Sequence, residues 1–255
     1  MRIVYLITFF ILGTVLGSFY NVVAFRLAKK ESIIKPRSHC PKCNHVLKPY
    51  ELIPILSFII QRGRCRNCQE KISVFYPLME FFSGILFAVS FYSFGFTYEL
   101  LIAISLVSLF IIVTVTDLNY YIIPDEINIA FAIIIFIINI LIHGIRGALN
   151  YLFYGLIMFL FMYALMLMGN FLFKQESLGG GDIKLLFVLG MVMPIVLSFF
   201  GLTLGAFLAL PVSIYLFIKH KDKVLPFGPF LVAGFLILYL LKIDVKDIYN
   251  LFIIG

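Results

Sequence analysis

Long apolar stretches, separated by short polar segments, constrain the fold of this chain more than any other feature. Of its 255 residues 62% are hydrophobic and only 13% are charged, against about a quarter charged in soluble proteins. Several stretches reach the ~20 residues that a helix needs to cross ~30 Å of hydrocarbon. Backbone groups in lipid must be paired within their own segment, which favours helices. The sequence therefore predicts an all-α polytopic membrane protein.

We predict about eight transmembrane helices, at residues 3–25, 76–95, 98–116, 126–143, 148–173, 183–199, 200–218 and 225–241. The spans 183–199 and 200–218 are short and adjoining, so an alternative is one hairpin that crosses incompletely. The first span shows no small-residue cleavage site, so we expect a retained helix and a mature chain that starts at Met1. The predicted divisions are a first transmembrane helix (1–25), a cytoplasmic metal-binding loop domain (26–75) and a multi-span domain (76–255).

The placement of basic residues predicts the orientation of the chain, because Lys and Arg are retained on the cytoplasmic side. Sixteen of the 20 lie in the loops 26–75, 174–184 and 219–224, and the others are Arg2, Arg146, Lys242 and Lys246. The loop 26–75 is thus expected in the cytoplasm, and with eight crossings the segments 117–125 and 174–182 share that face. The net charge of +7 reflects this bias and attraction to anionic lipid, and it requires no nucleic-acid partner.

All four cysteines lie in the loop 26–75, as two CxxC pairs separated by 21 residues: Cys40, Cys43, Cys65 and Cys68. This spacing is typical of a tetrahedral four-cysteine zinc site. Two disulfides or four free thiols are the alternatives, and a reducing compartment disfavours the disulfides. His39 and His45 flank the first pair and can substitute as ligands, although four thiolates already complete the shell.

The predicted metal is structural. A loop of about 50 residues with few large apolar side chains has too little core to fold alone, so a metal would be its main fold-determining interaction. Four thiolates leave no open position for water or substrate, which argues against metal-assisted hydrolysis.

Asp117 is the most unusual acidic residue, because it ends the apolar run 101–116, which contains no charged residue. An ionisable group at or just inside the membrane interface is costly, and the default hypothesis is a functional one. Glu80, inside the span 76–95, is likewise interpreted as functional or paired. Asn21 and Arg26 either position a substrate or anchor the first helix at the interface.

Asp182 follows Gly179, Gly180 and Gly181 and precedes an apolar helix. Alone, it is explained as a helix cap that accepts backbone N–H groups. The three glycines weaken this explanation, because they remove side chains before the carboxylate and allow a substrate backbone to approach.

Two carboxylates that share one proton can hydrolyse a peptide bond without a covalent intermediate. One, ionised, activates water, while the other, protonated, polarises the scissile carbonyl. Asp125 is a rival for the first role, but it follows Pro124 and starts the next span, where helix-dipole effects explain it. We therefore predict Asp117 and Asp182 as the catalytic pair.

These residues and motifs resemble the type IV prepilin leader peptidases, which belong to the GxGD-type membrane aspartyl proteases, over nearly the whole chain. The similar segments are the first-helix block from Gly17 to Arg26, the cysteine pairs, Tyr76–Glu80, the block from Asp117 to Asp125, the block from Gly179 to Leu186, and Pro226–Phe230. In that family the aspartate that opens the first catalytic block and the aspartate of GxGD are the catalytic pair.

The resemblance implies an enzyme that removes the leader from prepilins or pseudopilins at the cytoplasmic face of a bacterial plasma membrane. It also implies N-methylation of the new terminus, with S-adenosylmethionine as methyl donor, and Gly63 occupies a position associated with methylation. No dinucleotide-type glycine fingerprint supports this second activity. Family members that only cleave lack the cysteine domain, so its presence favours the two-activity type.

Three other functions stay open: a leader peptidase without methyltransferase activity, a proton-coupled transporter, and a non-enzymatic secretion scaffold. A transporter more often shows internal repeats or a mid-helix acid, and neither occurs here. The sequence does not specify the pilus, secretion or DNA-uptake system that the protein serves, or its oligomeric state.

Overall fold

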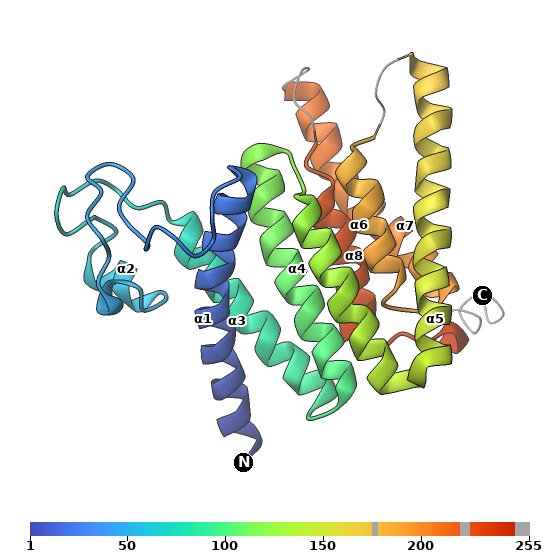
Figure 1. Cartoon of the computed structure of the whole chain (residues 1–255), viewed down its shortest axis with the longest axis horizontal. Helices are drawn as coiled ribbons and strands as arrows, with labels where there is room; N and C mark the ends of the chain where they lie inside the picture. Colours follow the sequence, from blue (N-terminus) through green and yellow to red (C-terminus); the bar gives the residue numbers. More distant parts are fainter. Residues whose placement is uncertain (175–177, 220–224, 248–255) are drawn as a thin grey trace. The chain divides into compact units, whose positions relative to one another are not determined.

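The computed structural model describes residues 1–174, 178–219 and 225–247, most of them in helices (Figure 1). Lys221 and Lys223, two of the basic residues predicted to face the cytoplasm, lie outside these described residues. Within the described ranges, β structure is limited to two isolated bridges, His39 with Val46 and Arg64 with Lys71. The predicted all-α class is confirmed. The chain forms two compact units, Met1–Gly95 and Phe96–Gly255.

The first unit is a pair of packed helices with a long loop between them. Helix α1 spans Arg2–Ala28 and α3 spans Phe75–Phe94. The loop contains the 3-10 helix η1 (Pro49–Glu51) and the short helix α2 (Leu56–Ile60). Small residues allow the two long helices to approach closely. A Cβ added at Gly17 would lie 2.7 Å from the Cβ of Ser83, which shows how tight this contact is.

The second unit is built around α4 (Tyr98–Tyr120), followed by α5 (Asp125–Phe173), α6 (Gly180–Gly190), α7 (Ile195–Lys219) and α8 (Gly228–Leu240). Helix α4 packs on α5 and α8, while α6 packs on α5, and α7 on α8. The core lies along α4, whose fully buried side chains include Leu106, Val107, Leu109, Ile111, Val113 and Val115. A helix enclosed in this way holds its C-terminal turn in a defined position.

Five helices in the described part of the chain are long and apolar enough to cross a membrane: α1, α3, α4, α5 and α7. The chain is therefore a membrane protein. Helix α5 has 49 residues, about twice the length that one crossing needs. It contains a break at Gly144, with φ 68° and ψ 176°, a conformation that glycine tolerates because it has no Cβ. The predicted spans 126–143 and 148–173 are thus joined through one residue, without the expected connecting loop.

The predicted boundary between residues 199 and 200 is wrong. Helix α7 runs unbroken through that point, and the chain turns instead between α6 and α7, around Pro194. Pro194 has no N–H to donate to a carbonyl of the preceding turn, so α6 cannot continue through it into α7. Helix α6 keeps only 11 residues and is too short to cross alone. The predicted number of eight spans is therefore not confirmed.

Candidate active site

Asp117 lies inside the last turn of α4, whereas we had expected the helix to end at residue 116. The helix continues to Tyr120 and stops because Tyr121 adopts a left-handed conformation, with φ 55° and ψ 35°. The N–H of Tyr121 donates to the Asp117 carbonyl at 3.0 Å. The Asp117 residue is only 6% exposed, so its carboxylate is enclosed by the protein.

The Asp117 carboxylate contacts the start of α8. Its Oδ2 accepts a hydrogen bond from the N–H of Gly228 at 3.0 Å, and Gly228 is the first residue of that helix. The first N–H groups of a helix have no intrahelical acceptor and carry partial positive charge, so they suit an anion. No Lys, Arg or His of the described residues forms an ion pair with Asp117. Among the described residues, the Asp117 carboxylate is thus held by a backbone N–H and by no cationic side chain.

Asp182 is the third residue of α6, and Gly179 occupies the N-cap position. The Asp182 side chain is half-buried and accepts no hydrogen bond from the described part of the chain, so helix capping does not explain it. Its carboxylate interacts electrostatically with that of Asp117. The fold thus brings together two acids that are far apart in the sequence.

Ile123, in the connection between α4 and α5, lies beside the start of α6 and the start of α8. A Cβ added at Gly181 would be 3.1 Å from the Ile123 Cβ, and one at Gly228 would be 2.8 Å from its Cδ1. A Cβ at Gly180 would meet nothing within 4 Å. A side chain at Gly181 would therefore crowd Ile123, while Gly180 faces open space, as substrate access would need.

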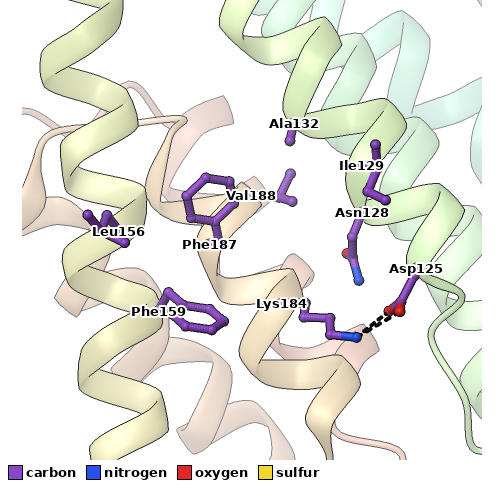
Figure 2. Close-up of a pocket in the computed structure, with 9 residues that line it drawn as sticks. All are labelled: Asp125, Asn128, Ile129, Ala132, Leu156, Phe159, Lys184, Phe187 and Val188. Carbon is purple, nitrogen blue, oxygen red and sulfur yellow. Dashed lines mark hydrogen bonds and ion pairs between the residues drawn. The ribbon is translucent and has the colours of Figure 1, made fainter.

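Asp125 does not join the pair. It is the first residue of α5, with Pro124 as N-cap, and its exposed carboxylate forms an ion pair with Lys184 Nζ at 2.7 Å (Figure 2). The sequence placed Lys184 in the basic segment 174–184 and in the block from Gly179 to Leu186, but it did not indicate that Lys184 pairs with Asp125. Asp125 is thus explained by its partner and by the helix start.

A groove of about 440 Å³ adjoins this ion pair, between α5 and α6, and is otherwise almost entirely apolar. Besides Asp125 and Lys184 its lining consists of Asn128, Ile129, Ala132, Leu156, Phe159, Phe187 and Val188. Figure 2 shows Asn128 pointing from α5 into the groove. This residue is 5% exposed, and neither its Oδ1 nor its Nδ2 has a hydrogen-bond partner in the described residues.

The two cysteine pairs adopt the same turn. The N–H of Cys40 donates to the carbonyl of His45, and the N–H of Cys65 donates to that of Glu70. In each turn the residue four positions after the first cysteine is left-handed: Asn44 (φ 54°) and Gln69 (φ 58°). Lys42 also forms an ion pair with Glu70, which links the two turns.

The four thiols form one cluster, with all Sγ atoms within 4.8 Å of one another and none in a disulfide. The Sγ atoms of Cys40 and Cys68 are 3.8 Å apart, and those of Cys43 and Cys65 are 3.9 Å apart. Zn–S bonds of about 2.3 Å in a tetrahedron place sulfurs at about this separation. The cysteines can therefore hold a metal ion.

Both histidines near the cluster have other partners. His45 Nε2 lies 3.2 Å from Glu51 Oε2, and His39 Nδ1 lies 2.9 Å from the carbonyl oxygen of Arg37. The metal-binding geometry among the described residues includes the four cysteines without either histidine.

Gly63 and Glu80 both hold the short helix α2 in the first unit: Gly63 contacts a residue of α2, and Glu80 binds the residue just before it. Gly63 has φ 67°, and a Cβ there would lie 3.0 Å from Phe58 Cζ in α2. Glu80, which is 9% exposed, accepts the N–H of Ile55 at 2.8 Å and a hydrogen bond from Ser18. Glu80 is thus paired, as one of its two interpretations required.

Asn21 and Arg26 both make anchoring contacts at the end of α1. Asn21 Nδ2 donates to the carbonyl of Tyr76 at 3.3 Å. The Arg26 guanidinium donates to the carbonyls of Ser32 and Pro36, at the start of the loop. Sequence reasoning missed Gly228, Ile123 and Ile55. Gly228 and Ile123 each had a signal, since they lie in the segment Pro226–Phe230 and in the block from Asp117 to Asp125.

Two protein families match the chain: the Bacterial Peptidase A24 N-terminal domain over residues 11–94 and the Type IV leader peptidase family over residues 104–214. The prepilin leader peptidase/N-methyltransferase of Bacillus subtilis is 36% identical over 257 residues, which cover 96% of this chain and 98% of that protein. The Myxococcus xanthus protein of that name is 41% identical over 183 residues, or 71% of this chain and 54% of its own length. The Aeromonas hydrophila protein is 31% identical, covering 90% and 88%. No solved structure shows significant similarity to the chain.

Proposed function

The chain belongs to the type IV leader peptidase family, and from this premise we propose that it is a membrane aspartyl endopeptidase acting on prepilins or pseudopilins. We propose further that it N-methylates the terminus that cleavage exposes, as the names of its relatives indicate. One observation carries the peptidase proposal: the carboxylates of Asp117 and Asp182 interact without any cationic partner in the described residues.

The contacts of the two acids suggest their roles. The N–H of Gly228 donates to Asp117, so the negative charge is better placed there. Asp117 would then be the base that removes a proton from the attacking water. Asp182 has no such donor in the described part of the chain and would carry the shared proton, donating it toward the scissile carbonyl oxygen. Two adjacent carboxylates resist double ionisation, which keeps one proton on the pair.

The glycines before Asp182 provide the access that a peptide substrate requires. Gly180 faces open space, and Gly179 presents no side chain beside the Asp182 carboxylate. An extended backbone can therefore approach the pair across the start of α6. We propose Gly179, Gly180 and Gly181 as the access route, with Gly181 also fixed by its contact with Ile123.

The cysteine cluster fits a structural Zn²⁺, because its Sγ separations match a tetrahedral thiolate site and four thiolates leave no open position. Cys40, Cys43, Cys65 and Cys68 would hold the ion and fix the loop 26–75. S-adenosylmethionine would supply the methyl group for transfer to the new amine. We associate Gly63 with this activity, since it lies two residues before Cys65.

We propose that the loop 26–75 and both acids face the cytoplasm, in the plasma membrane of a bacterium. The basic residues of that loop support this orientation. The hydrogen bond from the start of α8 to Asp117, together with the interaction between Asp117 and Asp182 at the start of α6, supports a common face for both acids. A basic leader would then reach the acids from the cytoplasm while the apolar part of the substrate stays in the bilayer.

Replacing single acids by asparagine tests the proposal. Each variant is co-expressed with a prepilin, and mass spectrometry of the product reports both leader removal and any added methyl group. Asp117→Asn and Asp182→Asn should each abolish cleavage in a folded protein. Asp125→Asn should cleave normally, because Asp125 is exposed and paired with Lys184. Loss of cleavage in Asp125→Asn but not in Asp117→Asn would overturn the assignment, and unchanged cleavage in both predicted catalytic variants would refute the aspartyl mechanism.

A further inference from the structure

The segment 52–60, between the two cysteine turns, exposes an apolar surface. Leu56, Ile59 and Ile60 are each more than half exposed, and Leu52 and Ile53 extend the same surface. Leu56, Ile59 and Ile60 are three or four residues apart and therefore share one face of α2, and Leu52 and Ile53 lie in the turn just before that helix. A cluster of exposed aliphatic side chains on a polar loop indicates a surface that is covered in the working protein.

The opposite face of α2 packs inside the loop. Phe58 contacts Gly63, since a Cβ on that glycine would lie 3.0 Å from the ring. The N–H of Gly63 also donates to the Phe58 carbonyl at 2.9 Å. The exposed aliphatic residues are therefore not a displaced part of the loop's own core.

The hydrogen bond between Ile55 and Glu80 shows where this surface lies along the axis of α3. Glu80 is the sixth residue of α3, so it lies about 7.5 Å along the helix axis from Phe75 at a rise of 1.5 Å per residue. Its carboxylate accepts the N–H of Ile55 at 2.8 Å. Ile55 immediately precedes α2, so α2 begins beside the second turn of α3 rather than beyond the helix end. Figure 1 shows the loop lying alongside α1 and α3.

The backbone conformation of Ile55 fits its hydrogen bond to Glu80. Ile55 has φ 62°, a left-handed conformation that is rare for a β-branched residue. Such a conformation persists where surrounding contacts hold it, and the hydrogen bond that the Ile55 N–H donates to the buried Glu80 carboxylate is one such contact.

Charge identifies what covers the surface. Exposed Lys48, Arg62 and Arg64 flank the segment on either side. The whole loop 26–75 holds eleven basic residues and three acidic ones. Aliphatic side chains bordered by lysine and arginine, at the level of the outer turns of a transmembrane helix, match the boundary between anionic headgroups and acyl chains.

We propose that residues 52–60 insert into the leaflet that adjoins the loop, with Leu56, Ile59 and Ile60 in the acyl region and the flanking basic residues on anionic headgroups. Interfacial helices lie about 5–10 Å into this boundary, which agrees with the level of Glu80. The segment is a lipid-binding surface that keeps Gly63 and the second cysteine turn at the membrane. This inference concerns binding alone and stands apart from either proposed activity.

The chain contains no tryptophan, so one introduced tryptophan is a unique fluorescent probe. The zinc-loaded full-length Ile59→Trp variant is reconstituted into vesicles of phosphatidylcholine and phosphatidylglycerol, with and without brominated acyl chains. Its emission should be shifted to the blue, quenched strongly by brominated lipid and weakly by aqueous iodide. Ile34→Trp is the matched control, because Ile34 is an exposed isoleucine of the same loop outside the segment. It should show the reverse pattern of quenching.

Two other results for Ile59→Trp would overturn the proposal. Quenching of Ile59→Trp by iodide would mean that the surface is in water. A blue-shifted emission that resists both quenchers would mean that protein covers it, from this chain or a second copy. In the Ile59→Trp background, Glu80→Gln keeps an acceptor for Ile55 and should preserve the lipid quenching, whereas Glu80→Ala should reduce it. Equal quenching in these two variants would refute the role of Glu80 in setting the depth.

Discussion

Gly228→Ala should impair catalysis although Gly228 bears no side chain and lies outside the catalytic sequence blocks. The new Cβ would lie 2.8 Å from Val113 Cγ1, 2.8 Å from Ile123 Cδ1 and 3.1 Å from Asp117 Oδ2. Because Val113 is fully buried and has little room to give way, we expect the start of α8 to move and its 3.0 Å hydrogen bond to Asp117 to be lost. Hydrogen bonds to charged groups contribute about 1.5–3 kcal/mol. At 1.36 kcal/mol per tenfold change in rate, kcat/KM should fall roughly 10- to 100-fold.

The assay is cleavage of a purified prepilin by the detergent-solubilised variant, alongside its thermal unfolding. Gly201→Ala is the matched control, because its Cβ would also meet a neighbour at 2.8 Å, the Phe235 ring in α8, but away from the acids. Both variants should lose about 1–3 kcal/mol of stability through overpacking. Only Gly228→Ala should lose catalytic rate in the folded fraction. Equal rates in the two variants would refute the claim that the Gly228 N–H supports Asp117.

Three further predictions concern the loop 26–75. Gly63→Ala should reduce methylation but not cleavage, because the new side chain is strained at φ 67° and lies against Phe58. Gly95→Ala is the control and should affect neither activity, because Gly95 has a similar φ of 61° but open surroundings. Mass spectrometry of the pilin product measures both activities. Purified protein should contain one zinc per chain by elemental analysis, and Cys43→Ser should lower that ratio, while an unchanged ratio would remove Cys43 from the site. The N–H of Lys48 lowers the pKa of Glu51 below its ordinary 4.5, so this contact stabilises the loop above that pH and is lost as the pH falls through the lowered value. Hydrogen exchange at the Lys48 amide should show that loss, relative to Glu51→Gln, which should show no such transition.

Much of the helical fold was predictable because lipid leaves the backbone few alternatives, and apolar runs mark where helices lie. The joins between helices were less predictable. Gly144 reads as an ordinary loop glycine, yet it joins two spans directly, and only the packed structure shows this. Pro194 lies at the real turn, but the apolar runs on each side of it conceal that turn in the sequence.

The two acids differ in how far sequence reasoning could reach. Asp117 stood out because a carboxylate at the end of an uninterrupted apolar run has no structural explanation. Asp182 resembled a helix cap, and its proximity to Asp117 arises only when the fold brings the start of α6 near the end of α4. Gly228 could not be assigned a role from its side chain, because its contribution is a backbone N–H at a helix start. Backbone donors leave little trace in sequence patterns.

The break at Gly144 also limits how the chain can change in length. Beyond it, Gly155 faces α6 so closely that a Cβ there would lie 2.6 Å from the Phe187 carbonyl oxygen, and one at Gly190 would lie 2.9 Å from the Gly155 Cα. Each inserted residue turns the second half of α5 by about 100° and advances it by about 1.5 Å. One insertion between Gly144 and Gly155 would therefore present a larger side chain to α6. Insertions of about 7 or 11 residues restore the helical phase but carry Gly155 about 10 or 17 Å along the axis and away from Gly190, so we expect these length changes to disrupt the contact as well.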